Sequence, residues 1–237
     1  LDYGKSNPIL PLKESGNITA GNSARIDWEQ VCPKKENDEI YIIGNPPYLG
    51  SSVQDKEQKS DMSLVFKAFN DFKNLDYVSI WFYKGAKYIE GINAQLAFVS
   101  TNSICQGEQV ALLWPKLISY SIEIGFAYQS FKWINNAKGN AGVTVVIIGL
   151  RNISSKKKEL FVNNIKKEVN NINGYLLNFK NIYFTRNSKP INGFPELVRG
   201  SMPTDGGNFE LTEDEKNDLL ENYPISNKFI KKYISGG

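Results

Sequence analysis

Apolar runs alternate with helix-like stretches along the first 150 residues, and this alternation constrains the fold more than any other feature. Runs at 40–43 and 95–100 indicate buried strands, and the apolar spacing between them predicts helices over 61–72 and 77–90. Strands that alternate with helices usually form a parallel sheet with helices on both faces. We therefore expect an α/β fold built on a partial, doubly wound, Rossmann-like sheet.

The last two apolar runs, 122–128 and 143–150, depart from this alternation. The loop between them is polar and contains glycine, and no helix is expected there. The two runs should therefore pair antiparallel as a hairpin, which gives a mostly parallel sheet with one antiparallel strand near an edge. A helix is also expected through Val110 and Leu113, and Pro115 is expected to kink or end it.

The composition changes after residue 150. Lysine and asparagine dominate residues 156–173, extended segments are expected over 175–185, and Thr212 opens a capping-box pattern that predicts a short helix. We therefore place the sheet in residues 1–152 and expect residues 153–237 to form an appended α+β segment.

The chain contains no histidine, which excludes Ser-His and Cys-His catalysis and histidine-based metal sites. Its two cysteines, Cys32 and Cys105, have no metal-ligand or redox spacing, so we expect buried thiols in a reducing compartment and no metal site. A net charge of +3 permits a nucleic-acid partner without requiring one. No run approaches the length of a membrane span, so no membrane partner is expected.

The glycine that ends the first apolar run is followed by Asn45, Pro46, Pro47 and Tyr48. Proline fixes its own φ and moves the preceding residue out of the helical region, so this segment is stiff and extended. Neither proline can donate a backbone hydrogen bond, so the Asn45 side-chain oxygen and the nearby carbonyls form an acceptor-rich surface. Ligands bind at the carboxyl ends of strands in open α/β sheets. This rigid pair of acceptors beside an aromatic ring suits a flat group that carries an NH2.

These residues alone leave other interpretations open. Asn-Pro-Pro is also a favourable turn, in which Tyr48 only covers the end of the sheet. Asp27 either binds a polar small molecule or caps a helix that begins at Trp28.

Taken with its surroundings, the motif resembles the MmeI-like class of bacterial DNA adenine methyltransferases, whose methylase lies within a longer restriction-modification polypeptide. The resemblance covers nearly the whole chain. The stretches that carry it are 21–28, 44–50, 75–78, 97–109, 131–133 and 202–207.

The resemblance implies that residues 1–152 are the carboxyl-terminal half of a methyltransferase catalytic domain. Residues 153–237 would then lead towards a target-recognition domain, and a nuclease can be fused elsewhere in the full-length chain. The expected partner is double-stranded DNA, and the expected location is the bacterial cytoplasm.

The resemblance also implies roles for individual residues. A methyl group would pass from S-adenosylmethionine to the 6-amino group of a flipped adenine, and Asn45, Pro46, Pro47 and Tyr48 would be the catalytic motif. In this scheme, the Asn45 oxygen and the Pro46 carbonyl accept the two amine hydrogens, and Tyr48 stacks on the base. The candidates for the opposite wall of the base pocket are Phe131 first and Trp133 second, although core packing explains either residue equally well. Asp27 would lie near the adenosine part of the cofactor.

The family's glycine-rich turn and its ribose-binding acidic residue would lie upstream of residue 1. We therefore expect an incomplete cofactor site, and an isolated fragment that binds S-adenosylmethionine weakly or not at all and does not methylate DNA. Two further functions stay open. The same motif serves methyltransferases of RNA adenine and of a protein glutamine amide, and the chain can also be a non-catalytic DNA-binding module that retains the fold.

Overall fold

The computed structural model describes residues 18–133, 143–184, 187, 189–190, 192–195, 206 and 208–232, with only the backbone described at Trp133. The chain divides into two compact units, residues 1–186 and residues 187–237. Each unit is described by itself.

The first unit is built on a six-stranded sheet with the strand order β1-β2-β4-β3-β5-β6. The strands are β1 (Ile40–Gly44), β2 (Ala94–Thr101), β3 (Ile122–Trp133), β4 (Val143–Asn152), β5 (Lys158–Val162) and β6 (Ile165–Val169).

The pairing makes this a mixed α/β sheet. Strand β1 pairs parallel with β2, and β3 pairs parallel with β5. Strand β4 lies between β2 and β3 and runs antiparallel to both, which confirms the predicted hairpin and its antiparallel strand. Strand β6 is a second antiparallel strand, which the sequence did not predict, and with β5 it extends the same sheet beyond residue 152.

The described residues of this unit include four helices. Helix α1 (Trp28–Val31) precedes β1, α2 (Lys56–Val65) and α3 (Ser79–Ile89) lie between β1 and β2, and α4 (Gly107–Ile118) lies between β2 and β3. Single 3-10 turns, η1 (Ser51–Val53), η2 (Phe72–Asn74) and η3 (Asn102–Cys105), connect them to their neighbours.

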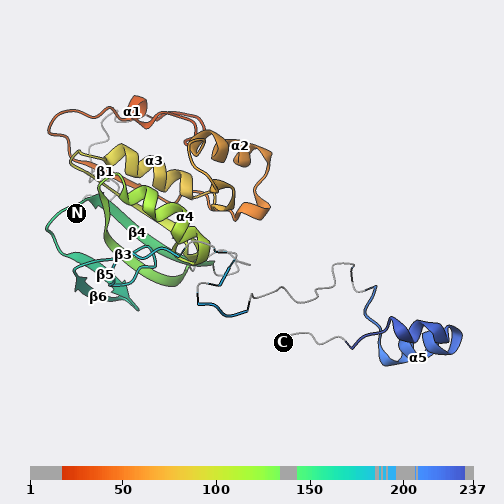
Figure 1. Cartoon of the computed structure of the whole chain (residues 1–237). Coiled ribbons are helices and arrows are strands. Elements are labelled where there is room, and N and C mark those ends of the chain that lie inside the picture. Colours follow the sequence, from red (N-terminus) through yellow and green to blue (C-terminus); the bar gives the residue numbers. More distant parts are fainter. Residues whose placement is uncertain are drawn as a thin grey trace, which may run out of the picture. The chain divides into compact units, whose positions relative to one another are not determined.

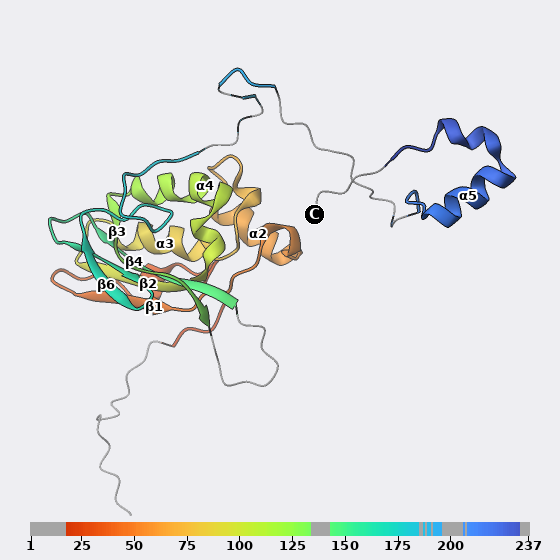
Figure 2. The ribbon, with the colours of Figure 1, turned by 90° about the horizontal axis from the view of Figure 1, so that it is seen from below.

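Helices α3 and α4 lie over the same face of the sheet (Figures 1 and 2). Their core side chains meet those of the strands, as where the Phe82 ring lies edge-on to Phe98 of β2 at 5.4 Å between ring centroids. On the opposite side, β1 exposes Tyr41 and Ile43, which are 60% and 83% accessible. We expected helices on both faces of the sheet. Among the described residues, α3 and α4 cover one face (Figure 2), and Tyr41 and Ile43 of β1 are exposed on the other.

One prediction about helices was wrong in detail. The helix expected over 61–72 begins and ends earlier, because an Asp55–Gln58 capping box opens α2 and its last helical residue is Val65. Of the two outcomes expected at Pro115, a kink or an end, the end does not occur, because α4 continues to Ile118. The Pro115 carbonyl still accepts a hydrogen bond from the Ser119 N–H at 3.1 Å.

Strands or extended segments are expected over 175–179 and 181–185, and residues 175–184 contain no strand, while Thr185 lies outside the described residues. The first of these segments is not extended. Instead, the Asn173 side chain accepts hydrogen bonds from the backbone N–H groups of Tyr175 and Leu177, and these bonds fold the chain into a turn.

The second unit contains α5 (Glu213–Asn222), followed by a 3-10 turn, η4 (Pro224–Lys228). Helix α5 opens with the predicted capping box, in which Thr212 and Glu215 exchange hydrogen bonds. In the described part of the chain, no helix combines the length and apolar character needed to cross a membrane.

Candidate active site

The Asn-Pro-Pro-Tyr segment leaves the carboxyl end of β1, as the sequence predicted. Asn45 and Pro47 are exposed, Pro46 is buried, and Tyr48 is half-buried against the hydrophobic core. The β1–β2 register pairs Gly44 with Phe98, so the sheet fixes the point at which the segment begins.

A cavity of about 370 Å³ lies against this segment. Residues of the motif line one part of it, and aromatic side chains from α1, α3 and β2 line the rest. The lining residues are Ser23, Trp28, Ile42, Ile43, Gly44, Asn45, Pro46, Pro47, Trp81 and Phe98. These flat apolar walls, with one amide and one hydroxyl, suit a planar ligand that also makes a few hydrogen bonds. Tyr48 does not line this cavity.

Asp27 lies at the start of α1, where its side chain accepts a hydrogen bond from the Glu29 N–H at 3.0 Å. The helix-cap interpretation is therefore confirmed. Asp27 is exposed and lines a neighbouring cavity of about 540 Å³, whose wall also includes Lys84 and Tyr88. Trp28 lines both cavities, whereas Asp27 and Asn45 each line only one of the two.

Lys84 of α3 holds the segment before Asp27 in place. Its ammonium group donates hydrogen bonds to the carbonyls of Ser23, Ala24 and Ile26, at 2.9, 2.9 and 2.6 Å. Burial lowers the pKa of Lys84, and the nearby Asp27 opposes this shift. The lysine therefore fixes the backbone that presents Ser23 and Trp28 to the motif cavity.

Asp61 of α2 holds the same segment from its other side and is only 2% exposed. Its carboxylate accepts hydrogen bonds from Asn22 Nδ2 at 2.9 Å, Arg25 Nε at 2.6 Å and the Tyr77 hydroxyl at 2.7 Å. Burial alone would raise the pKa of Asp61, but these three hydrogen bonds outweigh it, and the pKa lies below its ordinary value. Asp61 is therefore a charged structural centre.

Phe131 lies near the end of β3, at the edge of the sheet where β1 and β2 also end. The register places Phe131 opposite Val145, which in turn lies opposite Thr101 of β2. Phe131 is half-buried and does not line the motif cavity. The side chain of Trp133 lies outside the described residues. Both assignments to the base pocket therefore stay predictions.

Sequence reasoning missed three of the residues that line the motif cavity. Ser23 lies in the stretch 21–28, Trp81 lies in the predicted helix 77–90 and Phe98 lies in the predicted strand 95–100, and the local pattern gives none of them a role in the site. Trp81 Nε1 donates a hydrogen bond to Ser23 Oγ at 3.1 Å, which joins two of them. Only the packing of α3 on the sheet brings these residues to the motif.

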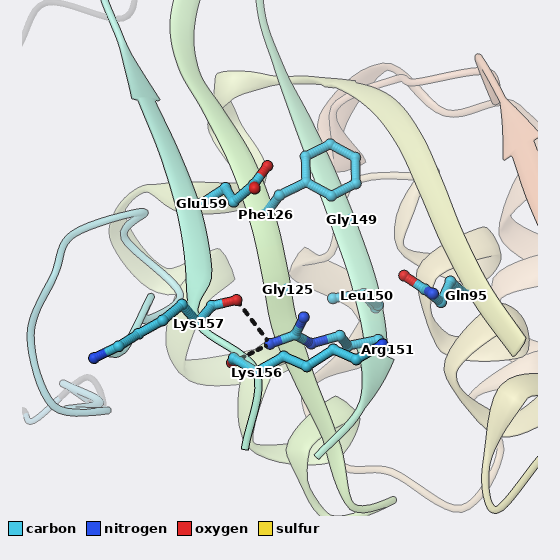
Figure 3. A pocket seen from close by; sticks show the side chains of 9 residues that line it. All are labelled: Gln95, Gly125, Phe126, Gly149, Leu150, Arg151, Lys156, Lys157 and Glu159. Atoms are coloured by element: carbon cyan, nitrogen blue, oxygen red, sulfur yellow. Dashed lines mark hydrogen bonds between the residues drawn. The ribbon is translucent and has the colours of Figure 1, made fainter. Parts of the chain in front are cut away.

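Another cavity, of about 330 Å³, lies across β2, β4, β3 and β5 and shares no residue with the motif cavity (Figure 3). Arg151 reaches across it and donates hydrogen bonds from Nη2 to the carbonyls of Lys156 and Lys157, at 2.7 and 3.3 Å. Its Nε binds Glu123 at 2.8 Å. The guanidinium group therefore braces the loop before β5, and we do not count this cavity as a candidate site.

Comparison with known proteins agrees with this geometry. A family model described as "MmeI, DNA-methyltransferase domain" matches residues 2–162, which is more than half of the chain. The chain belongs to the MmeI DNA-methyltransferase family. A second model, described as "MmeI, target recognition domain", matches residues 178–237.

Individual relatives of the MmeI family match over nearly the whole chain. DNA methyltransferase A of Bacillus subtilis (strain 168) is 49% identical over 228 residues, which are 96% of this chain and 26% of that protein. A solved structure of the Type IIL restriction-modification enzyme MmeI in complex with DNA matches with a TM-score of 0.83 and 39% identity, over 96% of this chain and 31% of that one. The chain thus spans about a quarter to a third of the length of these relatives. The predicted division after residue 152 stays a prediction.

Proposed function

We propose that the Asn45–Tyr48 edge transfers a methyl group from S-adenosylmethionine to the 6-amino group of adenine in double-stranded DNA. The observation that carries the proposal is the cavity at the carboxyl end of β1, where Asn45, Pro46 and Pro47 line one side in a chain of the MmeI family.

The chemistry requires acceptors for the amine. The nitrogen lone pair of adenine's amino group is delocalised into the ring, so the group is a weak nucleophile. The Asn45 side-chain oxygen and the Pro46 carbonyl accept its two hydrogens, which turns the lone pair towards the methyl donor and stabilises the positive charge that develops on nitrogen. Pro47 keeps this acceptor pair rigid and adds no competing N–H.

The bond-forming step needs no general base. The bond from nitrogen to the methyl carbon forms as the bond from sulfur to that carbon breaks, and one proton then leaves the amine for solvent. This scheme needs neither a histidine nor a covalent nucleophile, which suits a chain without histidine.

The residues of the site fit part of the cofactor. S-adenosylmethionine supplies an electrophilic methyl group on a positively charged sulfur. The aromatic wall of Trp28 and Trp81 suits the flat adenosine part. No carboxylate lines the motif cavity, and Asp27, the candidate for a polar contact, lines the neighbouring one. We therefore propose that the described residues contact the flat adenine ring of the cofactor, and that ribose and methionine contacts come from elsewhere in the polypeptide.

The base must leave the duplex to reach this edge. We assign Tyr48 to stack on the flipped adenine, a contact worth about 1–3 kcal/mol in nucleic-acid systems. Phe131 is the proposed opposite wall, and Trp133 is the second candidate. Residues 178–237 match a target-recognition model, which supports site-specific DNA as the partner and restriction-modification as the context.

The test is a methyl-transfer assay on the longest natural polypeptide that contains this chain. The protein is incubated with labelled S-adenosylmethionine and unmethylated genomic DNA, and the DNA is digested to nucleosides. We expect the label in N6-methyl-2′-deoxyadenosine. Label in a cytosine derivative, or no label in DNA, would contradict the proposal.

The same assay separates the alternatives. RNA and a translation release factor are supplied in parallel reactions, because RNA adenine and a glutamine amide present the same planar amine. Preference for either substrate would reassign the enzyme without changing the role of Asn45. DNA binding without transfer to any of the three substrates would support the non-catalytic DNA-binding module instead.

A further inference from the structure

We propose that Asp76 and Gln54 are positioning residues for methyl transfer, because together they fix the backbone of Leu49 and thereby the direction of the Asn45–Tyr48 edge. The proposal rests on the proposed function. Neither residue lines the motif cavity, and both side chains are buried, each 5% exposed.

Both polar groups of the Leu49 backbone are bound by these residues. The Leu49 N–H donates to Asp76 Oδ1 at 2.9 Å. The Leu49 carbonyl accepts from Gln54 Nε2 and from the Tyr77 N–H, both at 3.0 Å. Gln54 Nε2 also donates to the Leu75 carbonyl at 3.0 Å, so it joins the motif loop to the segment before α3.

Asp76 connects this anchor to the helical layer. Its Oδ1 also accepts from the Val78 N–H at 3.1 Å, at the start of α3, and its own N–H donates to Gln109 Oε1 of α4 at 3.0 Å. A longer hydrogen bond of 3.4 Å runs from Ser103 Oγ, in the turn η3 that follows β2, to Asp76 Oδ2. One carboxylate therefore links the motif loop to the start of α3 and to the turn after β2, the strand beside β1.

The hydrogen bonds at Leu49 lie close enough in the chain to Asn45 to control the position of the motif. The β1–β2 register fixes Gly44, and Asp76 and Gln54 fix Leu49, so only residues 45–48 lie between two fixed points. Two of these four residues are prolines, whose φ angles are fixed. The segment therefore has few free backbone dihedral angles. If Leu49 moves, the Asn45 side chain and the Pro46 carbonyl must move as well.

The main experiment compares Asp76→Ala with Asp76→Asn in the longest natural polypeptide that contains this chain. The alanine removes the acceptor for the Leu49 and Val78 amides. In Asp76→Asn, the side-chain oxygen still accepts from these two amides. The side-chain NH2 faces the Ser103 hydroxyl, which can accept a hydrogen bond from it. For Asp76→Ala we expect kcat to fall about 10- to 100-fold, with KM for S-adenosylmethionine and DNA within about 3-fold of wild type. Asp76→Asn should recover kcat to within about 5-fold of wild type.

Asn173→Ala is the matched control. Asn173 is also buried, and its Oδ1 likewise accepts from two backbone N–H groups, those of Tyr175 and Leu177, but none of its hydrogen bonds reaches the motif. It should keep kcat within about 3-fold of wild type. An equal loss of kcat in Asn173→Ala and Asp76→Ala would overturn the proposal, because it would show a general effect of lost stability.

If Asp76→Ala does not yield folded protein, Gln54→Met replaces it, because Gln54 holds the Leu49 carbonyl without bonding to α3. For Gln54→Met we again expect kcat to fall while both KM values stay within about 3-fold of wild type. A folded Gln54→Met variant with the kcat of wild type would overturn the proposal.

Hydrogen exchange at the Leu49 amide separates this proposal from the proposed function. Asp76→Ala should speed that exchange at least 10-fold, whatever the reaction is. If the wild-type polypeptide transfers no methyl group to any substrate, the proposed function fails by itself. Unchanged exchange at Leu49 in Asp76→Ala overturns the anchor itself.

Discussion

At the scale of single residues, buried charges and amides fix the segments that surround the motif cavity. Asp61 binds the side chains of Asn22 and Arg25, Lys84 binds three backbone carbonyls between residues 23 and 26, and Asp76 binds the Leu49 N–H. Asn45 and the two prolines after it could be predicted from the sequence, because their properties depend only on neighbouring residues. The sequence could not show these supports, since Asp61 meets Asn22 across 39 positions of the chain.

Asp61→Asn should destabilise the chain by about 1–3 kcal/mol at neutral pH. The amide NH2 replaces one carboxylate oxygen, so it faces either the Arg25 Nε–H or the donors of Asn22 and Tyr77, and a donor left without its acceptor is costly. Denaturant unfolding of the chain measures the difference, and Glu90→Gln, an exposed carboxylate at the end of α3, is the control.

The destabilisation should depend on pH. Because the pKa of folded Asp61 is lowered, its stabilisation is complete above the ordinary aspartate value of about 3.9 and is lost as pH falls through the lower folded value. The difference between wild type and Asp61→Asn should therefore shrink as pH falls from about 6 to about 3. A constant difference across that range would contradict the assigned charge.

At the scale of elements, hydrophobic pattern predicted the strands that have a buried face. The predicted runs at 40–43, 95–100, 122–128 and 143–150 correspond to β1 to β4. It missed β5 and β6. For β6 the reason is that its first four residues are exposed and include lysine and glutamate. Charged residues are a common way to protect an edge strand, so such a strand has no hydrophobic signature.

The packing of β3 on β4 depends on Gly149, across which the Phe126 ring lies. A Cβ at position 149 would meet Phe126 Cε1 at 2.1 Å, so the ring must move in Gly149→Ala. We expect a loss of about 1–3 kcal/mol in the free energy of unfolding. Gly50→Ala is the control, because a Cβ there meets nothing within 4 Å.

The double variant Gly149→Ala with Phe126→Ala tests the cause. Removal of the ring should make the Gly149→Ala substitution cost less than about 0.5 kcal/mol. If the cost is the same in both backgrounds, the close approach of the ring is not its source.

At the scale of the whole molecule, we propose that the described part of the chain supplies one half of a reaction centre. Asn45, Pro46 and Pro47 line the motif cavity, whereas no carboxylate among the described residues does. We predict that the isolated 237-residue chain binds S-adenosylmethionine weakly or not at all and transfers no methyl group to DNA. Calorimetric titration and a labelled-methyl assay measure the two properties, and the longest natural polypeptide is the positive control. Methylation by the isolated chain at a comparable rate would contradict this prediction.

The central claim is that the Asn45 oxygen holds the target amine, and the single-turnover rate of methyl transfer tests it most directly. The rate is measured for wild type and for Asn45→Ala in the longest natural polypeptide, with saturating labelled S-adenosylmethionine and DNA. The account predicts a fall of about 10²- to 10³-fold, while the affinities for DNA and cofactor change little, because the lost hydrogen bond acts mainly on the transition state. A rate within about 3-fold of wild type would contradict it.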